Sequence, residues 1–264
     1  MPGSLHIITL VKWVPDSQLE RSIGADRRLD RSEGILGELD EYPLEAALQI
    51  AENYENTRVT ALTMGPAGAS TAVKKALQIG ADDGVHLHDE ALAGADVYAT
   101  SAALAAAVNQ VRTSGGSEHY LVLTGMASED GESGAVPAQL AARLGVPVLT
   151  QARGVVLQDD QLQVERLSGE TLQTVAAPLP VVVSVTDQAN EPRYPNFRAM
   201  MKAKKKPVAV LGLAELGLTG HGVESKVSVV AAEPRAERTA GRLIHDDGTA
   251  GRQIADFLAE EGLL

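Results

Sequence analysis

Short apolar runs alternate with longer segments rich in Ala and Leu over the first two-thirds of the chain. The apolar runs predict strands at Leu5–Val11, Val59–Met64, Gly84–Leu87 and Tyr120–Leu123. The segments between them predict helices at Tyr42–Glu52, Ala67–Gln78, Asp96–Val111 and Gly134–Leu144. Strands separated by helices of this length are typical of right-handed βαβ crossovers. We therefore expect an α/β fold with a mainly parallel sheet and helices on both faces.

The pattern changes after about Gln151. Closely spaced strand candidates follow, which predict an antiparallel meander appended to the parallel sheet, at Val155–Gln158, Leu162–Leu167, Thr171–Ala176 and Val181–Val185. A further strand is predicted at Val208–Leu211 and a short final helix at Ile254–Leu258. The segment Leu218–His245 has few periodic apolar positions, so we expect an extended C-terminal arm that leans on a partner. These signals divide the chain into a domain at 1–217 and an arm at 218–264.

The composition argues against several classes of function. The formal net charge is −12, whereas a nucleic-acid partner would require a dominant basic surface. The chain has no cysteine, which excludes disulfides, iron–sulfur clusters and thiol catalysis. Aromatic residues make up only 3%, so we do not expect this chain to enclose a flavin by itself. We find no hydrolase or metalloprotease motif and no identifiable catalytic nucleophile, base or metal centre, so the chain is not predicted to be an enzyme.

The N-terminal sequence does not predict a membrane protein. Its apolar stretch, Leu5–Val11, is too short to span a bilayer. It also lacks the basic leader and the small-residue cleavage site of a signal peptide. We therefore expect a cytoplasmic location and no direct membrane insertion.

A glycine-rich loop from Gly125 to Gly134 follows one predicted strand and leads into a predicted helix. Glycines allow a close approach of the backbone to a ligand, and a helix N-terminus presents free N–H groups that favour phosphate. Ser133 adds a hydroxyl donor. The loop matches neither the P-loop nor the G-x-G-x-x-G dinucleotide motif, and Glu129, Asp130 and Glu132 would repel phosphate unless they point outward. The pattern therefore fits a nucleotide site and an ordinary strand–helix turn equally well.

A second turn, Met64-Gly65-Pro66, also follows a predicted strand. Alone it is more typical of a plain βα turn. Because the carboxyl ends of parallel strands meet at one edge of a sheet, we expect this turn and the Gly125 loop to lie together there. Two loops at one edge would make a better ligand cleft than either alone.

Two other pairs have both a chemical and a structural interpretation. Asp40 and Glu41 resemble an acid/base pair, but an acidic N-cap is favoured because negative charge stabilises a helix start. His86 and His88 are two positions apart on one predicted strand face, a spacing that suits half of a metal site. No other His or Cys is near in sequence, so the interpretation as surface histidines is favoured.

The segment Asn190–Phe197 joins a turn rich in Pro and Asn to the basic run Lys202–Lys206. Alone, the basic run is a targeting patch, a nucleic-acid patch or a solvated helix end, and the last is favoured. Its place beside Phe197 instead suggests a docking surface, in which charges surround an apolar anchor.

Several separated segments resemble the beta subunit of electron transfer flavoproteins. The resemblance covers about Leu5 to Gly217. It rests on the N-E-P-R-Y motif Asn190–Tyr194 and the M-K-A-K-K-K motif Met201–Lys206, and on Leu10–Asp16, Asp40-Glu41-Tyr42, Gly65-Pro66, Lys75–Leu77, Gly80–Asp82 and Val164–Val183.

The resemblance implies a Rossmann-like, adenine-nucleotide-binding (HUP-type) sheet and a heterodimer. An alpha subunit would hold the redox-active FAD, and this chain would bury AMP. The heterodimer would carry electrons from acyl-CoA dehydrogenases and related dehydrogenases to a membrane quinone oxidoreductase, as in fatty acid oxidation. By position, the residues that contact AMP would be Leu10, Gly37, Glu38, Leu39, Asp40, Met64, Gly125, Met126, Ala127, Ser128, Asp130, Gly131 and Ser133. Docking to partner proteins would use Tyr194, Phe197, Met201, Lys202 and Lys205, with Phe197 in place of the family's Leu anchor.

Two alternatives remain open at this point. Some relatives bind a second FAD in place of AMP and bifurcate electrons; the loop after Gly125 favours AMP here because it lacks the long Ala-Ile-Asp-Gly-Asp type of sequence. A stand-alone nucleotide-binding protein of the universal-stress type would share the parallel sheet and the phosphate loop. The meander, the Asn190–Lys206 segment and the arm would be surplus to such a protein.

Overall fold

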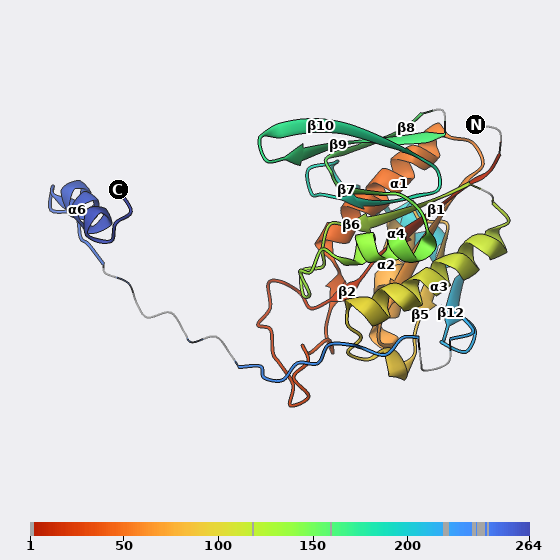
Figure 1. Ribbon diagram of the computed structural model, residues 1–264, viewed down its shortest axis with the longest axis horizontal. Coiled ribbons are helices and arrows are strands. Elements are labelled where there is room, and N and C mark those ends of the chain that lie inside the picture. The colour runs from red at the N-terminus through yellow and green to blue at the C-terminus, as the bar shows by residue number, and fades with distance from the viewer. Residues whose placement is uncertain are drawn as a thin grey trace. The chain divides into compact units, whose positions relative to one another are not determined.

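A seven-stranded parallel sheet forms the centre of the chain (Figure 1). The computed structural model describes residues 3–117, 119–158, 160–218, 222–233, 236, 241 and 243–264. The strand order is β12-β5-β4-β1-β6-β11-β7, and each strand is parallel to its neighbours. The strands are β1 (Leu5–Leu10), β4 (Thr57–Met64), β5 (Asp83–Leu87), β6 (His119–Gly125), β7 (Val148–Ala152), β11 (Val181–Val185) and β12 (Val208–Leu211).

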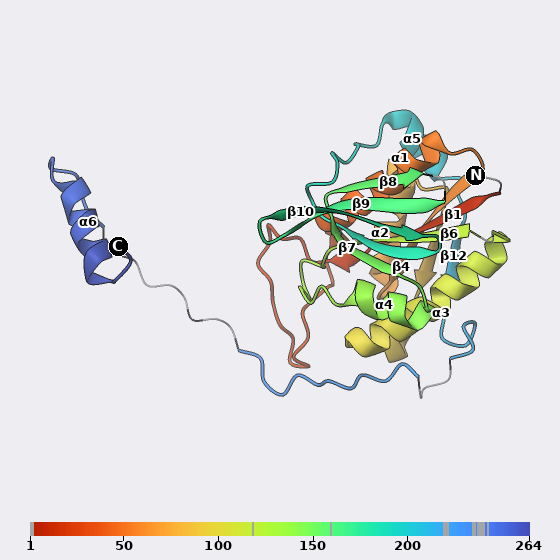
Figure 2. The ribbon, with the colours of Figure 1, turned by 45° about the horizontal axis from the view of Figure 1, so that its top comes forward.

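Helices cover both faces of this sheet, as Figures 1 and 2 show. On one face, α1 (Glu41–Asn53) and α2 (Ser70–Ile79) pack their apolar residues against strand residues such as Ile7. On the other face, α3 (Val97–Gly115) and α4 (Val136–Leu144) pack side by side against strand residues such as Ile8. The predicted α/β fold is therefore confirmed. Short 3-10 turns lie at η1 (Glu38–Asp40), η2 (Ala67–Ala69) and η3 (Glu90–Leu92), and β2 (Trp13–Val14) pairs with β3 (Ile35–Leu36).

The antiparallel meander is smaller than the sequence predicts. It consists of β8 (Gly154–Gln158), β9 (Gln161–Ser168) and β10 (Thr171–Pro178), and it lies beside β7 (Figure 2). The assignment of Val181–Val185 to this meander was wrong, because β11 pairs in parallel with β6 and β7. All five of its residues are buried, which is typical of a central parallel strand covered on both faces. Its partner β7 was not predicted at all, because the polar pair Thr150 and Gln151 interrupts its apolar pattern.

The chain divides into two units, Met1–Val230 and Ala231–Leu264. In the first unit, the backbone N–H groups of Lys226 and Val227 donate to the Asp96 carboxylate at 2.6 and 2.9 Å, which ties the start of the predicted arm to the beginning of α3. In the second unit, α6 (Ala250–Glu260) includes the predicted final helix and has no buried residue. Residues 219–221, 234–235, 237–240 and 242 of the predicted arm lie outside the described residues. Among the helices of the described chain, none is long and apolar enough to cross a membrane.

Candidate functional site

Three loops meet at the carboxyl edge of the sheet. Because β4, β1 and β6 are adjacent and parallel, the loops that follow Met64, Leu10 and Gly125 leave the same edge, as expected. The segment Gly37–Asp40, which leads into α1, joins them: the Lys12 carbonyl accepts the Gly37 N–H at 2.9 Å. This is the edge at which open α/β sheets bind ligands.

An ion-pair cluster holds the Gly125 loop in place. The Asp130 carboxylate accepts Lys12 Nζ at 2.6 Å, and Arg31 donates to it through Nη2 and Nε at 2.6 and 3.0 Å. The Asp130 side chain is 1% exposed. Burial acts to raise the pKa of Asp130, but the charges and hydrogen bonds of Lys12 and Arg31 outweigh it and hold this pKa well below its usual range. Two cations therefore face one buried carboxylate.

The acidic residues of this loop do not all point outward. Glu129 Oε1 accepts the backbone N–H of Leu39 at 3.1 Å, so both Glu129 and Asp130 turn toward neighbouring loops. The condition set for phosphate binding, that these acidic side chains point outward, is therefore not fulfilled by Glu129 and Asp130. Asp130 is neutralised by Lys12 and Arg31, and Glu129 is used to join the Gly125 loop to the Gly37–Asp40 segment.

Asp40 is buried between the two segments. Asp40 is the N-cap residue of α1, as predicted, but its carboxylate accepts the backbone N–H of Lys12 at 2.7 Å and makes no capping hydrogen bond to the helix. Burial is the main cause that raises its pKa to about 7, and nearby Glu129 adds to the effect. A carboxyl group of this kind changes its charge near neutral pH.

Gly125 allows this close packing. A Cβ atom at this position would lie 2.6 Å from Asp40 Oδ1 and 3.0 Å from the Leu39 carbonyl oxygen. A side chain here would therefore push β6 away from the Gly37–Asp40 segment. The glycine serves contact between protein segments, in addition to any approach of a ligand.

The donors at this edge suit a phosphate group. Lys12 Nζ donates to Ser128 Oγ at 3.2 Å as well as to Asp130, and Arg31 also donates to the Asp130 carboxylate. The first N–H groups of α4 have no intrahelical partner, as at every helix start, and the N-cap, Ala135, has no side-chain capping bond; Pro137 in the first turn offers no N–H. Ser133 Oγ accepts the Ala135 N–H at 3.4 Å and lies at the entry to α4. Cations, hydroxyls and a helix N-terminus together match the chemistry of a nucleotide phosphate.

The loops that follow Met64 and Gly125 lie at one edge of the sheet, as predicted, whereas Lys12 and Arg31 were not predicted to lie there. The predicted contacts Gly37–Asp40 and Gly125–Asp130 are brought together by the bonds described above, while Leu10 and Met64 lie at the ends of their strands. Lys12 stands two residues after Leu10, so its position after a parallel strand was an available signal. Arg31 lies in a loop without any pattern. The role of each residue in cofactor binding stays a prediction.

The turn before α5 (Phe197–Ala203) is fixed to α1. Arg193 pairs with buried Glu45 through Nε to Oε2 at 2.7 Å and Nη2 to Oε1 at 2.9 Å, and Nη1 reaches Glu52 at 2.5 Å. Asn190 Nδ2 also donates to the Tyr42 carbonyl at 2.9 Å. Burial acts to raise the pKa of Glu45, but Arg193 outweighs it and lowers that pKa. The N-E-P-R part of the motif thus anchors the segment.

The residues after this anchor are exposed. Tyr194 is 92% exposed and Phe197 is 76% exposed, and Met201, Lys202 and Lys205 are also at the surface. The helix α5 begins at an Asn196 side chain that accepts the Ala199 N–H at 2.9 Å. An ordered helix that leaves a large apolar side chain in water is typical of a contact surface.

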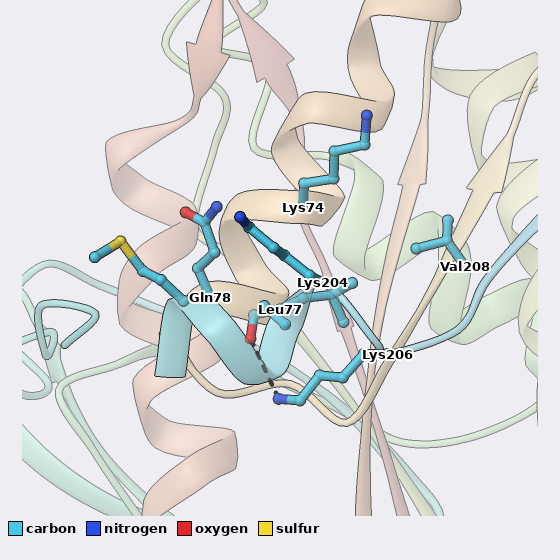
Figure 3. A pocket seen from close by; sticks show the side chains of 8 residues that line it. Lys74, Leu77, Gln78, Lys204, Lys206 and Val208 are labelled. Atoms are coloured by element: carbon cyan, nitrogen blue, oxygen red, sulfur yellow. Dashed lines mark hydrogen bonds between the residues drawn. The ribbon is translucent and has the colours of Figure 1, made fainter. Parts of the chain in front are cut away.

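The last lysine of the basic run has a structural role. Lys206 Nζ donates to the carbonyl oxygens of Leu77, Gly80 and Ala81 at 3.2, 3.0 and 2.5 Å, and Figure 3 shows the first of these bonds. These carbonyls lie at the C-terminal end of α2, where a cation is favourable. Burial lowers the pKa of Lys206. The solvated interpretation therefore does not hold for this residue.

His86 and His88 position the Gly65 turn. His86 Nε2 and His88 Nδ1 both donate to the Gly65 carbonyl oxygen at 3.1 Å, and their rings stack 5.4 Å apart. His86 is buried, so the prediction of a surface histidine was wrong there. Within the residues that the structure describes, no group of three or more His, Cys, Asp or Glu side chains could hold a metal ion.

This chain is similar in sequence to members of one protein family. The family described as "Electron transfer flavoprotein domain" matches residues 28–216. Two proteins named electron transfer flavoprotein subunit beta, from Mycobacterium bovis and Mycobacterium leprae, are 41% and 40% identical to this chain; each alignment covers 98% of this chain and 99% of the relative. A protein from Acetobacterium woodii named "Caffeyl-CoA reductase-Etf complex subunit CarD" is 32% identical over 81% of both chains.

Proposed function

The chain belongs to the electron transfer flavoprotein family, and we propose that it is the beta subunit of a heterodimer that carries electrons from dehydrogenases to a quinone oxidoreductase. The observation that carries this proposal is the 41% identity to a beta subunit over 98% of the chain. The exposed Phe197 on an anchored helix supports a docking role, because a carrier must bind its donor and release it.

We propose that AMP binds at the carboxyl edge of the sheet. Lys12 and Arg31 would offset the phosphate charge, Ser128 and Ser133 would supply hydroxyls, and the N-terminus of α4 would supply N–H groups. The backbone of the Gly37–Asp40 segment would lie against the base. Leu10, Met64, Gly125, Met126, Ala127, Asp130 and Gly131 complete the proposed contacts. FAD, which takes up and gives off the electrons when bound, would be held mainly by the alpha subunit.

The second unit of the chain supports a partner-bound arm. The exposed or half-exposed apolar side chains of α6, Ile254, Phe257 and Leu258, recur at the spacing that places them on one helix face. Among the described residues of its unit, this helix has an apolar face and no buried residue. We propose that this face packs on the alpha subunit.

Exchange of Ser133 for Asp tests the nucleotide site. The new carboxylate would stand beside the phosphate and repel it, so we expect the purified heterodimer to lose AMP while it keeps FAD. The matched control is Ser114→Asp, which puts the same charge at an exposed position near the C-terminal end of α3, at the opposite, amino end of the sheet. AMP released by heat is measured by chromatography. Full AMP retention in Ser133→Asp would contradict the assignment of the loop.

Exchange of Phe197 for Ala tests the docking surface. A central apolar anchor typically contributes about 2 kcal/mol or more to binding, equivalent to a rise of about thirty-fold in the Kd of the dehydrogenase complex. We expect slower reduction of the flavin by an acyl-CoA dehydrogenase and an unchanged flavin content. Replacement of the exposed Leu172 on β10 by Ala is the matched control. Unaltered kinetics with every dehydrogenase tested would remove Phe197 from the docking surface.

A second candidate function is electron bifurcation with a second FAD in place of AMP. This alternative is supported by the similarity to a protein whose name places it in a reductase–Etf complex. Two FAD and no AMP in each heterodimer would support this alternative.

A further inference from the structure

A groove of about 290 Å³ lies between α2 and α5 (Figure 3). Its apolar lining comes from Leu77, Met200, Ala203 and Val208, and the polar side chains of Lys74, Gln78, Lys204 and Lys206 complete it. We call this the α2–α5 groove. Its volume is at the lower limit of small-molecule pockets, which are roughly 300–1,000 Å³, so it suits a single protein side chain better than a cofactor.

The charge of the groove is positive and unneutralised. The Lys206 amine is already used by three carbonyl groups of the α2 end. By contrast, the Lys74 and Lys204 amines have no hydrogen-bond or ion-pair partner within the described chain. Four of the five residues from Lys202 to Lys206 are lysines, although the whole chain carries a net charge of −12. This local excess selects for carboxylates on whatever binds there.

The groove adjoins the docking surface along α5. Phe197 and Met201 are exposed on α5, and Met200, three residues after Phe197 and therefore its neighbour on the helix surface, lines the groove. A protein that covers Phe197 would therefore reach the groove within one short helix of seven residues. The anchor at Arg193 and Asn190 fixes the turn that leads into this helix, so both features are presented on a rigid support.

We infer that the α2–α5 groove receives an apolar side chain, flanked by carboxylates, from the dehydrogenase that donates electrons. This inference rests on the proposed function as an electron carrier. The helix α5 then makes a two-way contact: it inserts Phe197 into the dehydrogenase and accepts a side chain from it. The apolar lining provides affinity, and Lys74 and Lys204 provide charge complementarity and faster association.

The test is steady-state reduction of the purified heterodimer by an acyl-CoA dehydrogenase at several salt concentrations. Lys74→Glu combined with Lys204→Glu should raise the KM for the heterodimer about ten-fold at low salt, with less effect at high salt, because salt screens exposed charges. Met200→Gln should raise KM by a similar factor at every salt concentration, because it removes apolar contact without a change in charge. Flavin content and kcat should stay as in the wild type.

Each single reversal, Lys74→Glu and Lys204→Glu, is matched to Arg153→Glu, which changes the net charge by the same amount at an exposed position on the link between β7 and β8. An equal rise in KM for this control would overturn the inference, because net charge alone would explain the effect. Unchanged KM in both groove variants, with a wild type that is reduced normally, would also overturn it and leave the proposed function intact. If no dehydrogenase reduces the wild-type heterodimer, the proposed function itself fails. Loss of the alpha subunit or of flavin from the groove variants would assign the groove to the subunit interface instead.

Discussion

Removal of the Arg193 guanidinium should loosen the docking segment and destabilise the chain. Arg193 joins the turn before α5 to Glu45 and Glu52 of α1. Exchange for Met keeps much of the side-chain volume but removes the charge and the donors. The Glu45 carboxylate, whose side chain is 5% exposed, would then be left buried without its cation.

The expected cost follows from this burial. Removal of one partner from a buried ion pair typically costs about 3–5 kcal/mol. Arg193 is 35% exposed, so solvent screens part of the interaction and we expect a value near the lower end, about 3 kcal/mol. Glu52 is 59% exposed and its pair should contribute less than about 1 kcal/mol. Glu45 therefore accounts for most of the effect.

A double-mutant cycle measures this coupling. The free energy of unfolding of the heterodimer is determined by urea titration for Arg193→Met, Glu45→Gln and the double variant. We expect the double variant to recover at least about 2 kcal/mol relative to the sum of the single changes, because it leaves no unpaired buried charge. Glu52→Gln is the matched control for charge. Additive single changes, or an equal loss in Glu52→Gln, would refute the role assigned to Glu45.

Two further predictions concern stability. The pKa of Asp40 is about 7 in the folded chain against 3.8 as its ordinary value, so its stabilising contribution is lost as pH rises between about 4 and 7. Asp40→Asn should therefore gain up to about 4 kcal/mol of unfolding free energy relative to the wild type across this window, measured by urea unfolding at pH 4 and pH 8, and parallel pH curves would contradict it. Lys206→Met should cost about 1–2 kcal/mol, because it leaves the carbonyl groups at the end of α2 without their donor. Lys205→Met is the control for that change, and an equal loss of unfolding free energy in both variants would show that Lys206 is not a cap.

The sequence predicted the elements whose signals are local. The strands β1, β4, β5 and β6 have short, mainly apolar runs, and the four main helices have recognisable start signals, so their existence and type could be predicted directly. The place of β11 could not, because the sequence does not distinguish a hairpin neighbour from a strand that crosses back to the parallel sheet. Its uniform burial decides the question only once the fold is known.

The candidate site was predictable by segment but not by side-chain role. The Gly125 loop and the Gly37–Asp40 segment were identified, yet the contacts of Lys12, Arg31 and Glu129 join residues 90 to 118 positions apart. Such contacts leave no periodic signal. The same is true of Arg193, whose partners lie 148 and 141 positions away in α1. The segment Asn190–Phe197 was predicted to be a docking surface. In the structure, Asn190 and Arg193 anchor it to α1, and Tyr194 and Phe197 are exposed.

The most direct test of the proposed function is the cofactor content of this chain purified together with an alpha subunit encoded by the same organism. Heat release followed by chromatography gives the amounts of FAD and AMP for each heterodimer. We predict a stable yellow heterodimer with one FAD and one AMP. Two FAD without AMP would contradict AMP as the ligand of the proposed nucleotide site, and a colourless chain without a partner would contradict the role as an electron carrier.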